Sequence, residues 1–430
     1  MSSGKRFLAR WAKRARIAVA QLREALGIRS FGLYIDQPVH GEIQNAFFII
    51  EGWFVSKFDS APISLRVNNR DVAWTAVERP DVKRIFPRRS SQGFRAPLEV
   101  SRLLTDEVRS DKRTNLQFVE GGEVVAEYAL TMSDEAIRDA ELTPGYLRAK
   151  REWLKQNMAC PLCPGGSGGL LFNDDRIQCI NCGEMFVNGG TVFDFLPQDL
   201  RRQFRIEDVD DVSTHPYDDI SKRVIEEARR KEGKVLDCGC GMRTRVDEAV
   251  ICLDVTPFPT VDVLAVNQRL PFRNGVFDAV LSLNVLEHVT DPFLCAAELV
   301  RVLKPGGTLH CCIPFLQPEH GYPHHYFNAT RSGLRELFAS DLEILEHLVP
   351  RSGEPVWTLH WFLSWYAEQL PSQEKKAFLK MRVRDVIEES PSSLLDAPWV
   401  RFLSEEGKWK LASTTAAVFR KPLTDGLSER

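Results

Sequence analysis

The sequence predicts a multidomain protein in which an all-β region and a small cysteine-rich module precede an α/β domain built on a parallel sheet. Three observations support this order. Short segments rich in β-branched and aromatic residues alternate with turn residues between 31 and 132. Two C-x2-C pairs follow between 160 and 182. Beyond them, two apolar strands flank a glycine turn and the second strand ends in an acidic residue, a pattern that suits a nucleoside-bearing cofactor.

Length and composition limit the class of protein. A chain of 430 residues suggests two or three domains. Its hydrophobic fraction of 43% and charged fraction of 27% are ordinary for a soluble globular protein. The net charge of −3 does not favour nucleic acid as a partner. No apolar run is long enough to span a bilayer, no secretory signal is evident, and the cysteine pattern fits a reducing compartment, so we expect a cytoplasmic protein.

Residues 1–29 are predicted to form a basic amphipathic helix, since many lysines and arginines accompany a single acid, Glu24. Its apolar stripe repeats at helical spacing and consists of Leu8, Trp11, Ala15, Ala18, Leu22 and Leu26. One interpretation is peripheral contact with the anionic inner face of a membrane. The alternatives are a helix docked on the next domain and a disordered arm.

Residues 30–132 are predicted to form an antiparallel β-sandwich. Runs such as Phe47–Ile50 and Val124–Leu130 are rich in β-formers, and Gly121-Gly122 marks a turn between strands. No acid pair or nucleophile constellation occurs there, which favours a structural or docking role. Residues 133–157 are charged and alternate at helical spacing, which predicts a connecting helix.

The segment 158–197 is predicted to be a zinc ribbon with structural zinc. Each C-x2-C turn presents two thiolates, and fifteen residues separate the two pairs. Two such turns complete a tetrahedral site whose four sulfur ligands leave no open position, so the zinc would not be catalytic. Free thiols are the alternative interpretation. The expected ligands are Cys160, Cys163, Cys179 and Cys182.

The stretch from Lys234 to Gly241 has the sequence K-V-L-D-C-G-C-G and carries the clearest functional signal. A short buried strand runs into a glycine turn, and a second apolar strand ends at Asp254. Glycine allows close approach of a ligand to the backbone, and an acid at the strand end can accept both ribose hydroxyls. Alone, a D-x-G-x-G turn is weak evidence, because it occurs in many loops.

Four further motifs follow in order, which are Leu270-Pro-Phe272, Phe277-Asp-Ala-Val280, Leu286-Glu-His-Val289 and Leu303-Lys-Pro-Gly-Gly307. From about 215 to 350 the chain therefore resembles the class I S-adenosylmethionine-dependent methyltransferases, in particular their type 11-like branch. The resemblance implies a Rossmann-like seven-stranded domain over 198–422, with strands at Leu342–Val349 and Leu411–Arg420. An aromatic-rich insertion at about 351–409 and a tail at 423–430 complete the predicted organisation.

The same resemblance implies a site for S-adenosylmethionine. The glycine turn would line the methionine end of the cofactor and Asp254 would bind the ribose. Val266 stands where relatives usually carry an acid for the adenine amino group, so Asn267 or backbone groups would make that contact. The implied cofactor-binding residues are Asp237, Gly239, Gly241, Asp254, Asn267, Leu270 and Asn284.

The acceptor side is predicted at the loop from Gln317 to Thr330, which follows a strand of the sheet. Relatives tend to carry P-H-D-Y there, whereas this chain has P-H-H-Y. Histidine suits proton removal at neutral pH. The candidate catalytic residues are His325, His324, His320 and Tyr326.

Other interpretations of the acceptor side stay open. A metal held by His320 with His324 is one alternative. Glu287 and His288 are interpreted first as fold-stabilising or cleft-lining groups, and direct catalysis is the alternative. In some relatives an acid at the position of Asn284 helps to hold a divalent metal, which makes this chain's version a poorer metal site.

Three functions are compatible with these features. The first is O-methylation of a saccharide, glycolipid or other small-molecule hydroxyl in envelope or glycan biosynthesis. This function is favoured by the basic helix and by the aromatic insertion. It is also favoured by the likeness of the β-rich region to modules found beside bacterial glycan-building enzymes. The second is RNA methylation with the zinc ribbon as docking module. The third is a non-catalytic cofactor-binding or adaptor protein. The sequence leaves the oligomeric state open.

Overall fold

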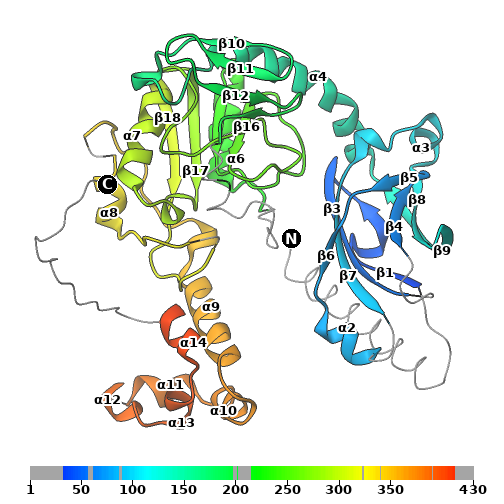
Figure 1. Cartoon of the computed structure of the whole chain (residues 1–430). Coiled ribbons are helices and arrows are strands. Elements are labelled where there is room, and N and C mark those ends of the chain that lie inside the picture. Colours follow the sequence, from blue (N-terminus) through cyan, green and yellow to red (C-terminus); the bar gives the residue numbers. More distant parts are fainter. Residues whose placement is uncertain are drawn as a thin grey trace, which may run out of the picture. The chain divides into compact units, whose positions relative to one another are not determined.

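The computed structural model describes residues 32–56, 62–86, 90–196, 201, 215–321, 324–338, 340–389 and 391–411. The predicted basic helix, the tail and almost all of the strand expected at Leu411–Arg420 lie outside these residues. The chain divides into two compact units, Met1–Leu283 with Arg301–His310, and Asn284–Val300 with Cys311–Arg430 (Figure 1). None of the helices among the described residues is both long and apolar enough to span a bilayer.

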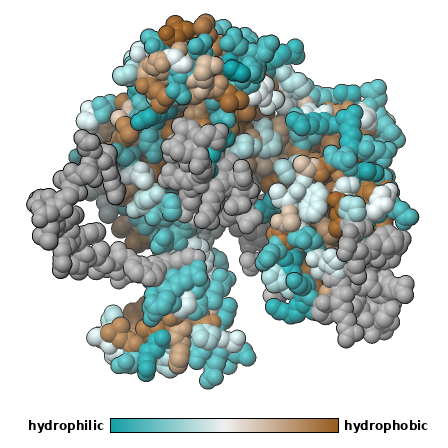
Figure 2. Space-filling view, viewed as in Figure 1, coloured by the Kyte–Doolittle hydropathy of each residue, from teal (hydrophilic) through white to brown (hydrophobic). Residues whose placement is uncertain are grey.

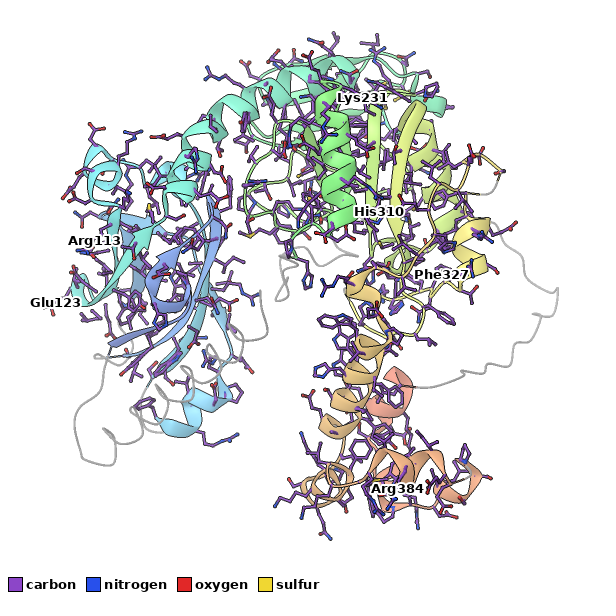
Figure 3. The ribbon with its side chains drawn as sticks, turned by 180° about the vertical axis from the view of Figure 1, so that it is seen from behind. Arg113, Glu123, Lys231, His310, Phe327 and Arg384 are labelled. Carbon is purple, nitrogen blue, oxygen red and sulfur yellow. The ribbon has the colours of Figure 1, made fainter. Side chains whose placement is uncertain are left out.

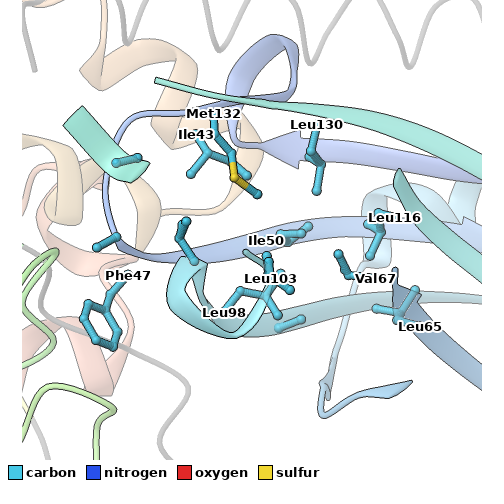
Figure 4. Packing of buried hydrophobic residues seen from close by; sticks show 14 of the residues in the cluster. Ile43, Phe47, Ile50, Leu65, Val67, Leu98, Leu103, Leu116, Leu130 and Met132 are labelled. Carbon is cyan, nitrogen blue, oxygen red and sulfur yellow. The ribbon is translucent and has the colours of Figure 1, made fainter. Parts of the chain in front are cut away.

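The N-terminal region is all-β in its main elements, as predicted. One sheet has the order β1 (Gly32–Gln37), β3 (Phe47–Val55), β7 (Ser91–Glu99), β6 (Thr75–Val77). The other has the order β2 (Glu42–Ile43), β9 (Glu123–Met132), β8 (Arg113–Glu120), β4 (Ile63–Val67), β5 (Arg70–Val72). Side chains of both sheets share one core, in which Ile50 and Leu65 are fully buried (Figure 4). Two short helices, α2 (Pro80–Ile85) and α3 (Asp106–Asp111), lie between strands.

A long helix, α4 (Asp134–Asn157), confirms the predicted connection. It begins where the Ser133 side chain accepts a hydrogen bond from the Ala136 N–H. Its C-terminal half is anchored on the α/β region by Lys150, whose Nζ lies 2.6 Å from an Asp262 carboxylate oxygen. Both side chains are buried. One turn away, the Trp153 ring packs 5.3 Å from the ring of Phe277.

The cysteine-bearing strands and the α/β strands form one nine-stranded sheet. Its order is β10 (Leu170–Phe172), β11 (Arg176–Cys179), β12 (Met185–Asn188), β13 (Phe193–Asp194), β16 (Val263–Leu264), β15 (Val250–Asp254), β14 (Val235–Cys238), β17 (Phe277–Leu283), β18 (Leu303–Cys312). The first four strands are antiparallel to one another. The β13–β16 pair, with Phe193 opposite Val263, is parallel and joins the two parts.

The helix α6 (Asp219–Arg230) confirms the helix expected before the glycine turn. Its apolar face, which includes Val224 and Ile225, packs into the core cluster beneath β14 and β15. Lys231 follows its C-terminal end, and His310 of β18 lies at its other end (Figure 3). There the Nδ1 of His310 is 3.2 Å from the hydroxyl oxygen of Ser221.

The prediction of a strand at Leu342–Val349 is wrong, because these residues form no strand. Their apolar positions do not alternate, and Leu345 and Val349 are 76% and 63% exposed. In the described part of the chain, the α/β region therefore contributes five strands, β14 to β18, rather than seven.

The aromatic-rich segment folds into short helices instead. They are α9 (Pro355–Glu368), α10 (Ser372–Phe378), α11 (Val383–Ile387), α12 (Pro391–Leu394), α13 (Pro398–Arg401) and α14 (Glu405–Lys410). Tyr366 packs against Phe378 and Trp399, with ring centroids 4.9 and 5.8 Å away. Tyr366 is thus buried in a small helical core. Trp357 and Phe362 of the aromatic run are exposed, as are Val383 and Ile387, and hydrophobic residues are visible on this surface (Figure 2).

We expect Lys150→Met to lower the free energy of unfolding by about 3–5 kcal/mol, because it leaves the buried Asp262 carboxylate without its cation. Asp262→Asn should cost a similar amount, and the double variant should cost less than the sum of the two. Chemical denaturation followed by circular dichroism measures all three. Lys155→Met, which removes only the solvent-exposed pair with Glu152, is the matched control and should change stability by less than about 1 kcal/mol. Additive losses in the double variant would contradict the pairing.

Candidate active site

The glycine turn after β14 is tied to the neighbouring strand by its own backbone. The N–H groups of Gly239 and Cys240 both donate to the carbonyl oxygen of Leu253, over 2.8 and 3.1 Å. Gly239 and Gly241 have φ angles of 69° and 60°, in the left-handed region that favours glycine. These N–H groups are already hydrogen-bonded, so they are not free to donate to a ligand. The two glycines instead leave room for a ligand, because they have no Cβ atom.

Asp254 ends β15 beside this turn. One of its carboxylate oxygens accepts from the Gly241 N–H over 2.8 Å, and the other accepts from the Thr256 N–H over 2.9 Å. The residue is 8% exposed, and burial raises the pKa of its carboxyl. Each oxygen keeps a second lone pair, so the carboxylate can still accept hydroxyl donors.

Asp237 lies on the other side of the turn and is held by two residues that the sequence analysis missed. The Nε and Nη2 atoms of Arg243 lie 2.9 and 2.7 Å from one Asp237 oxygen, and the Tyr217 hydroxyl donates to the same oxygen over 2.6 Å. The Arg243 guanidinium also stacks on the Tyr217 ring, 4.0 Å from its centroid.

The second oxygen of Asp237, Oδ1, has no hydrogen-bond partner within the described residues, although the side chain is fully buried. A buried carboxylate oxygen that lacks a hydrogen-bond partner can accept a hydrogen bond from a donor group of a ligand. The donors and acceptors around the glycine turn therefore fit a polar cofactor that carries ribose and amino-acid groups.

The sequence contained one indication of the role of Arg243. This residue occupies the second position after Gly241, where a third glycine would continue the G-x-G alternation.

The loop after β16 carries the residues predicted for the adenine end. Val266 packs against the core cluster of the α/β region, which leaves no charged group at this position. Asn267 is 6% exposed and Leu270 is 1% exposed. The Leu270 carbonyl oxygen accepts from an Arg301 guanidinium nitrogen over 2.9 Å, which holds the L-P-F segment in place. Whether these residues contact adenine stays a prediction.

The second unit contains Asn284 and all four candidate catalytic residues. Asn284 has a φ of 56°, an uncommon conformation for a residue other than glycine. The ring of His320 lies 4.5 Å from that of His325 and 5.5 Å from that of His288. His324 and Tyr326 are exposed, with rings 5.5 Å apart. The structure thus brings two of the predicted histidines together with His288 and leaves the other pair at the surface.

The hydrogen bonds of His325 fix its tautomer. Its Nδ1 accepts from the His320 backbone N–H over 3.1 Å, so Nδ1 carries no proton. Its Nε2 lies 3.1 Å from the Phe327 carbonyl oxygen and 2.9 Å from the Asn328 side-chain oxygen, and donates there. Both ring nitrogens are engaged, so the predicted role of His325 as a base requires this loop to rearrange.

Glu287 belongs to the short 3-10 helix η5 (Leu286–His288) that follows β17 along the chain. Its side chain is 0% exposed, and burial raises the pKa of its carboxyl to about 8. Burial also lowers the pKa of His288 and of His320. A buried acid beside imidazoles was not evident from the sequence, because the L-E-H-V motif alone does not show which of its side chains is enclosed.

The four predicted zinc ligands come together in the first unit. Cys160 Sγ lies 3.7 Å from Cys182 Sγ, and Cys163 Sγ lies 3.6 Å from Cys179 Sγ. All four sulfur atoms lie within 4.8 Å of one another. Burial opposes ionisation of Cys179, but the backbone N–H groups of Cys182 and Asn181 point at its sulfur and lower its pKa to about 7.

Comparison with known proteins identifies the central part of the chain. Residues 218–311 match a family model described as a methyltransferase domain. An uncharacterized methyltransferase of Mycobacterium sp. (strain JLS) is 51% identical over 45 residues, or 10% of this chain and 18% of the relative. The uncharacterized protein MJ0638 of Methanocaldococcus jannaschii is 34% identical over 140 residues, or 30% of this chain and 60% of the relative. The chain thus spans less than two thirds of the length of these relatives.

Solved structures add little to this result. Phosphoethanolamine N-methyltransferase 2 of Haemonchus contortus, in complex with S-adenosyl-L-methionine, is 12% identical and aligns over 78% of this chain and 64% of its own. Its TM-score of 0.22 is too low to inform fold or function. The sequence matches support the methyltransferase domain that was predicted within the α/β region.

We expect Arg243→Lys to weaken S-adenosylmethionine binding about tenfold or more. A lysine ammonium cannot reproduce the planar contact with both Asp237 and the Tyr217 ring, so the Asp237 carboxylate loses its fixed orientation. Isothermal titration calorimetry with the cofactor measures the effect. Arg245→Lys, two positions along the same loop and exposed, is the matched control. Equal affinities for the two variants would show that Arg243 does not support the cofactor site.

Proposed function

We propose that the chain is an S-adenosylmethionine-dependent methyltransferase that methylates a hydroxyl of a saccharide, glycolipid or other small molecule in envelope or glycan biosynthesis. The observation that carries the enzymatic part is the juxtaposition of the glycine turn with Asp254. They follow the carboxyl ends of the adjacent parallel strands β14 and β15, where ligands bind in open α/β sheets. The matched methyltransferase domain covers both.

In this proposal the first unit binds and orients the cofactor, which supplies an electrophilic methyl group on sulfur when bound. Asp254 accepts the ribose hydroxyls with its remaining lone pairs. Asp237, fixed by Arg243 and Tyr217, presents its unpaired oxygen to the amino-acid end. The glycine turn admits the ligand because no Cβ stands in its way.

A base must take the hydroxyl proton as the acceptor oxygen bonds to the methyl group and the carbon–sulfur bond breaks. Of the predicted residues, we favour His324. Its ring is exposed, and within the described residues neither of its nitrogens makes a hydrogen bond. His325 uses both nitrogens within its own loop. Histidine suits this role because its unperturbed pKa is about 6.5.

Two alternatives remain as proposals. RNA methylation is supported by the cysteine-bearing strands, which extend the catalytic sheet and could dock a polynucleotide. A non-catalytic adaptor is supported by Val266 and by the altered histidine loop. We also propose that residues 30–132 are a β-sandwich docking module. Peripheral membrane contact through residues 1–29 and a cytoplasmic location stay predictions.

We expect radiolabelled methyl groups from S-adenosylmethionine to enter the glycan or lipid-linked fraction of a bacterial lysate incubated with the protein. Scintillation counting of separated RNA, lipid-linked glycan and small-molecule fractions measures this. Asp254→Ala should abolish labelling by loss of cofactor binding, and Glu248→Gln, an exposed acid nearby, should not. Label in RNA would establish the second candidate. Cofactor binding without label in any fraction would establish the third.

We propose that Cys160, Cys163, Cys179 and Cys182 hold a structural zinc ion as a zinc ribbon. Two tight turns, sulfur atoms within 4.8 Å and backbone N–H groups aimed at Cys179 sulfur support it. A zinc ion with Zn–S bonds of about 2.3 Å spaces its ligands about 3.8 Å apart, close to the observed 3.6 and 3.7 Å.

The zinc proposal predicts that the variant Cys160→Ser/Cys163→Ser loses about one zinc ion per chain and has a lower melting temperature. Elemental analysis and calorimetry provide the two readouts. Cys295→Ser, a buried cysteine outside the cluster, is the control for zinc content. Equal zinc in the double variant and in the unmodified chain would exclude this site.

A further inference from the structure

We propose that Glu287, His288 and His320 form a second metal site, which binds a divalent transition-metal ion independently of the four-cysteine cluster. All three residues belong to the second unit. One ligand atom from each lies within 4.8 Å of the other two. The site combines an enclosed carboxylate with two oriented imidazoles at a spacing that one ion can bridge.

The Glu287 carboxylate is fully enclosed without a hydrogen-bond donor. Its side chain is 0% exposed, and in the described part of the chain neither Oε1 nor Oε2 has a hydrogen-bond partner. An isolated buried carboxylate is costly unless a cation or donors compensate it. Its backbone is fixed, since the Glu287 carbonyl oxygen accepts from the Tyr326 N–H over 2.7 Å. The structure thus fixes the position of the Glu287 carboxylate, and a bound cation would balance its negative charge.

Each of the two histidines has one unprotonated ring nitrogen that can bind a metal ion. The Nδ1 of His288 lies 2.8 Å from the His324 carbonyl oxygen, and the Nδ1 of His320 lies 2.9 Å from the Pro318 carbonyl oxygen. A carbonyl oxygen can only accept, so each Nδ1 carries the proton and each Nε2 keeps a lone pair. Donation of the distal N–H to a backbone carbonyl is the usual way in which a protein orients a histidine ligand.

The spacing suits one ion once the three ligand atoms, which lie within 4.8 Å of one another, move closer together. His288 Nε2 is 3.8 Å from Glu287 Oε1. An ion bound at about 2.1 Å from each ligand in tetrahedral geometry requires separations of about 3.4 Å. Gly321 makes room for the His288 ring, because a Cβ there would lie 2.1 Å from the ring carbon Cε1. His325 accepts the His320 N–H and is a positioning residue rather than a ligand.

The donor set selects the kind of ion. Two neutral imidazoles and one carboxylate suit Zn²⁺, Fe²⁺ or Mn²⁺, whereas Mg²⁺ and Ca²⁺ prefer oxygen ligands throughout. Three protein ligands also leave a coordination position open, in contrast to the closed four-sulfur cluster. If the proposed methyl transfer to a hydroxyl holds, this open position would receive the acceptor oxygen; ion binding itself does not depend on that function.

The test counts zinc ions on the full-length chain after equilibrium dialysis against Zn²⁺. We expect His320→Gln and Glu287→Gln each to bind about one ion fewer per chain than the unmodified protein. His360→Gln, an exposed histidine on α9, is the matched control and should bind as many ions as the unmodified chain. His320 is only partly buried, so its variant should fold even if Glu287→Gln does not; thermal unfolding checks both.

Titration with Co²⁺ separates the two sites. Cobalt on the four-cysteine cluster gives intense thiolate-to-metal absorption, whereas cobalt on Glu287, His288 and His320 gives only weak visible bands. We expect the weak bands to survive in Cys160→Ser/Cys163→Ser and to vanish in His320→Gln. A folded His320→Gln protein with unchanged zinc content and cobalt spectrum would overturn the proposal. Metal binding without methyl transfer would instead count against the proposed function alone.

Discussion

The parallel pairing of β14 between β15 and β17 is the constraint on which the cofactor site depends. Asp237 lies opposite Cys252 on one side and Leu281 on the other. Because parallel strands end at the same edge of a sheet, this register brings the glycine turn next to Asp254. The Leu253 carbonyl, which receives two N–H groups of the turn, locks the two strand ends together. The chemistry of the site follows from this register.

The same sheet explains how the cysteine-bearing strands are joined to the α/β region. A parallel pair, β13 with β16, satisfies the backbone groups of a strand that would otherwise form an exposed edge. Asp262, just before β16, accepts from the Cys252 N–H over 2.7 Å and pairs with Lys150 of α4. One buried carboxylate therefore links the helix, β15 and the start of β16. Strand pairing and this ion pair make the cysteine-rich module part of the nine-stranded sheet.

The sequence predicted the strands on either side of the glycine turn correctly but not the segment Leu342–Val349, for a physical reason. Strands such as Val250–Asp254 are buried throughout and apolar up to the final aspartate, because both faces of a parallel sheet are covered, so pattern and motif agree. Leu342–Val349 has no such pattern, and its assignment as a strand rested on resemblance alone. Arg243 was missed because a charged side chain in a loop gives no periodic signal, and its position two residues after Gly241 was the one available indication. Its partner Asp237 is six residues away, and only the folded turn brings them together.

The family match covers the glycine turn and Asp254 but not the predicted acceptor loop. The match ends at residue 311, before the histidine loop and the helices α9 to α14. Enzymes that share one cofactor differ in the part that meets the acceptor, and function is decided by that site rather than by the fold. In this chain the unmatched part contains His320, His325 and an aromatic helical core, whereas Glu287 and His288 lie within the match. A carboxylate left without a donor, such as that of Glu287, is costly to maintain for packing alone. Its enclosure beside two oriented histidines is therefore the strongest physical indication of chemistry in addition to cofactor binding.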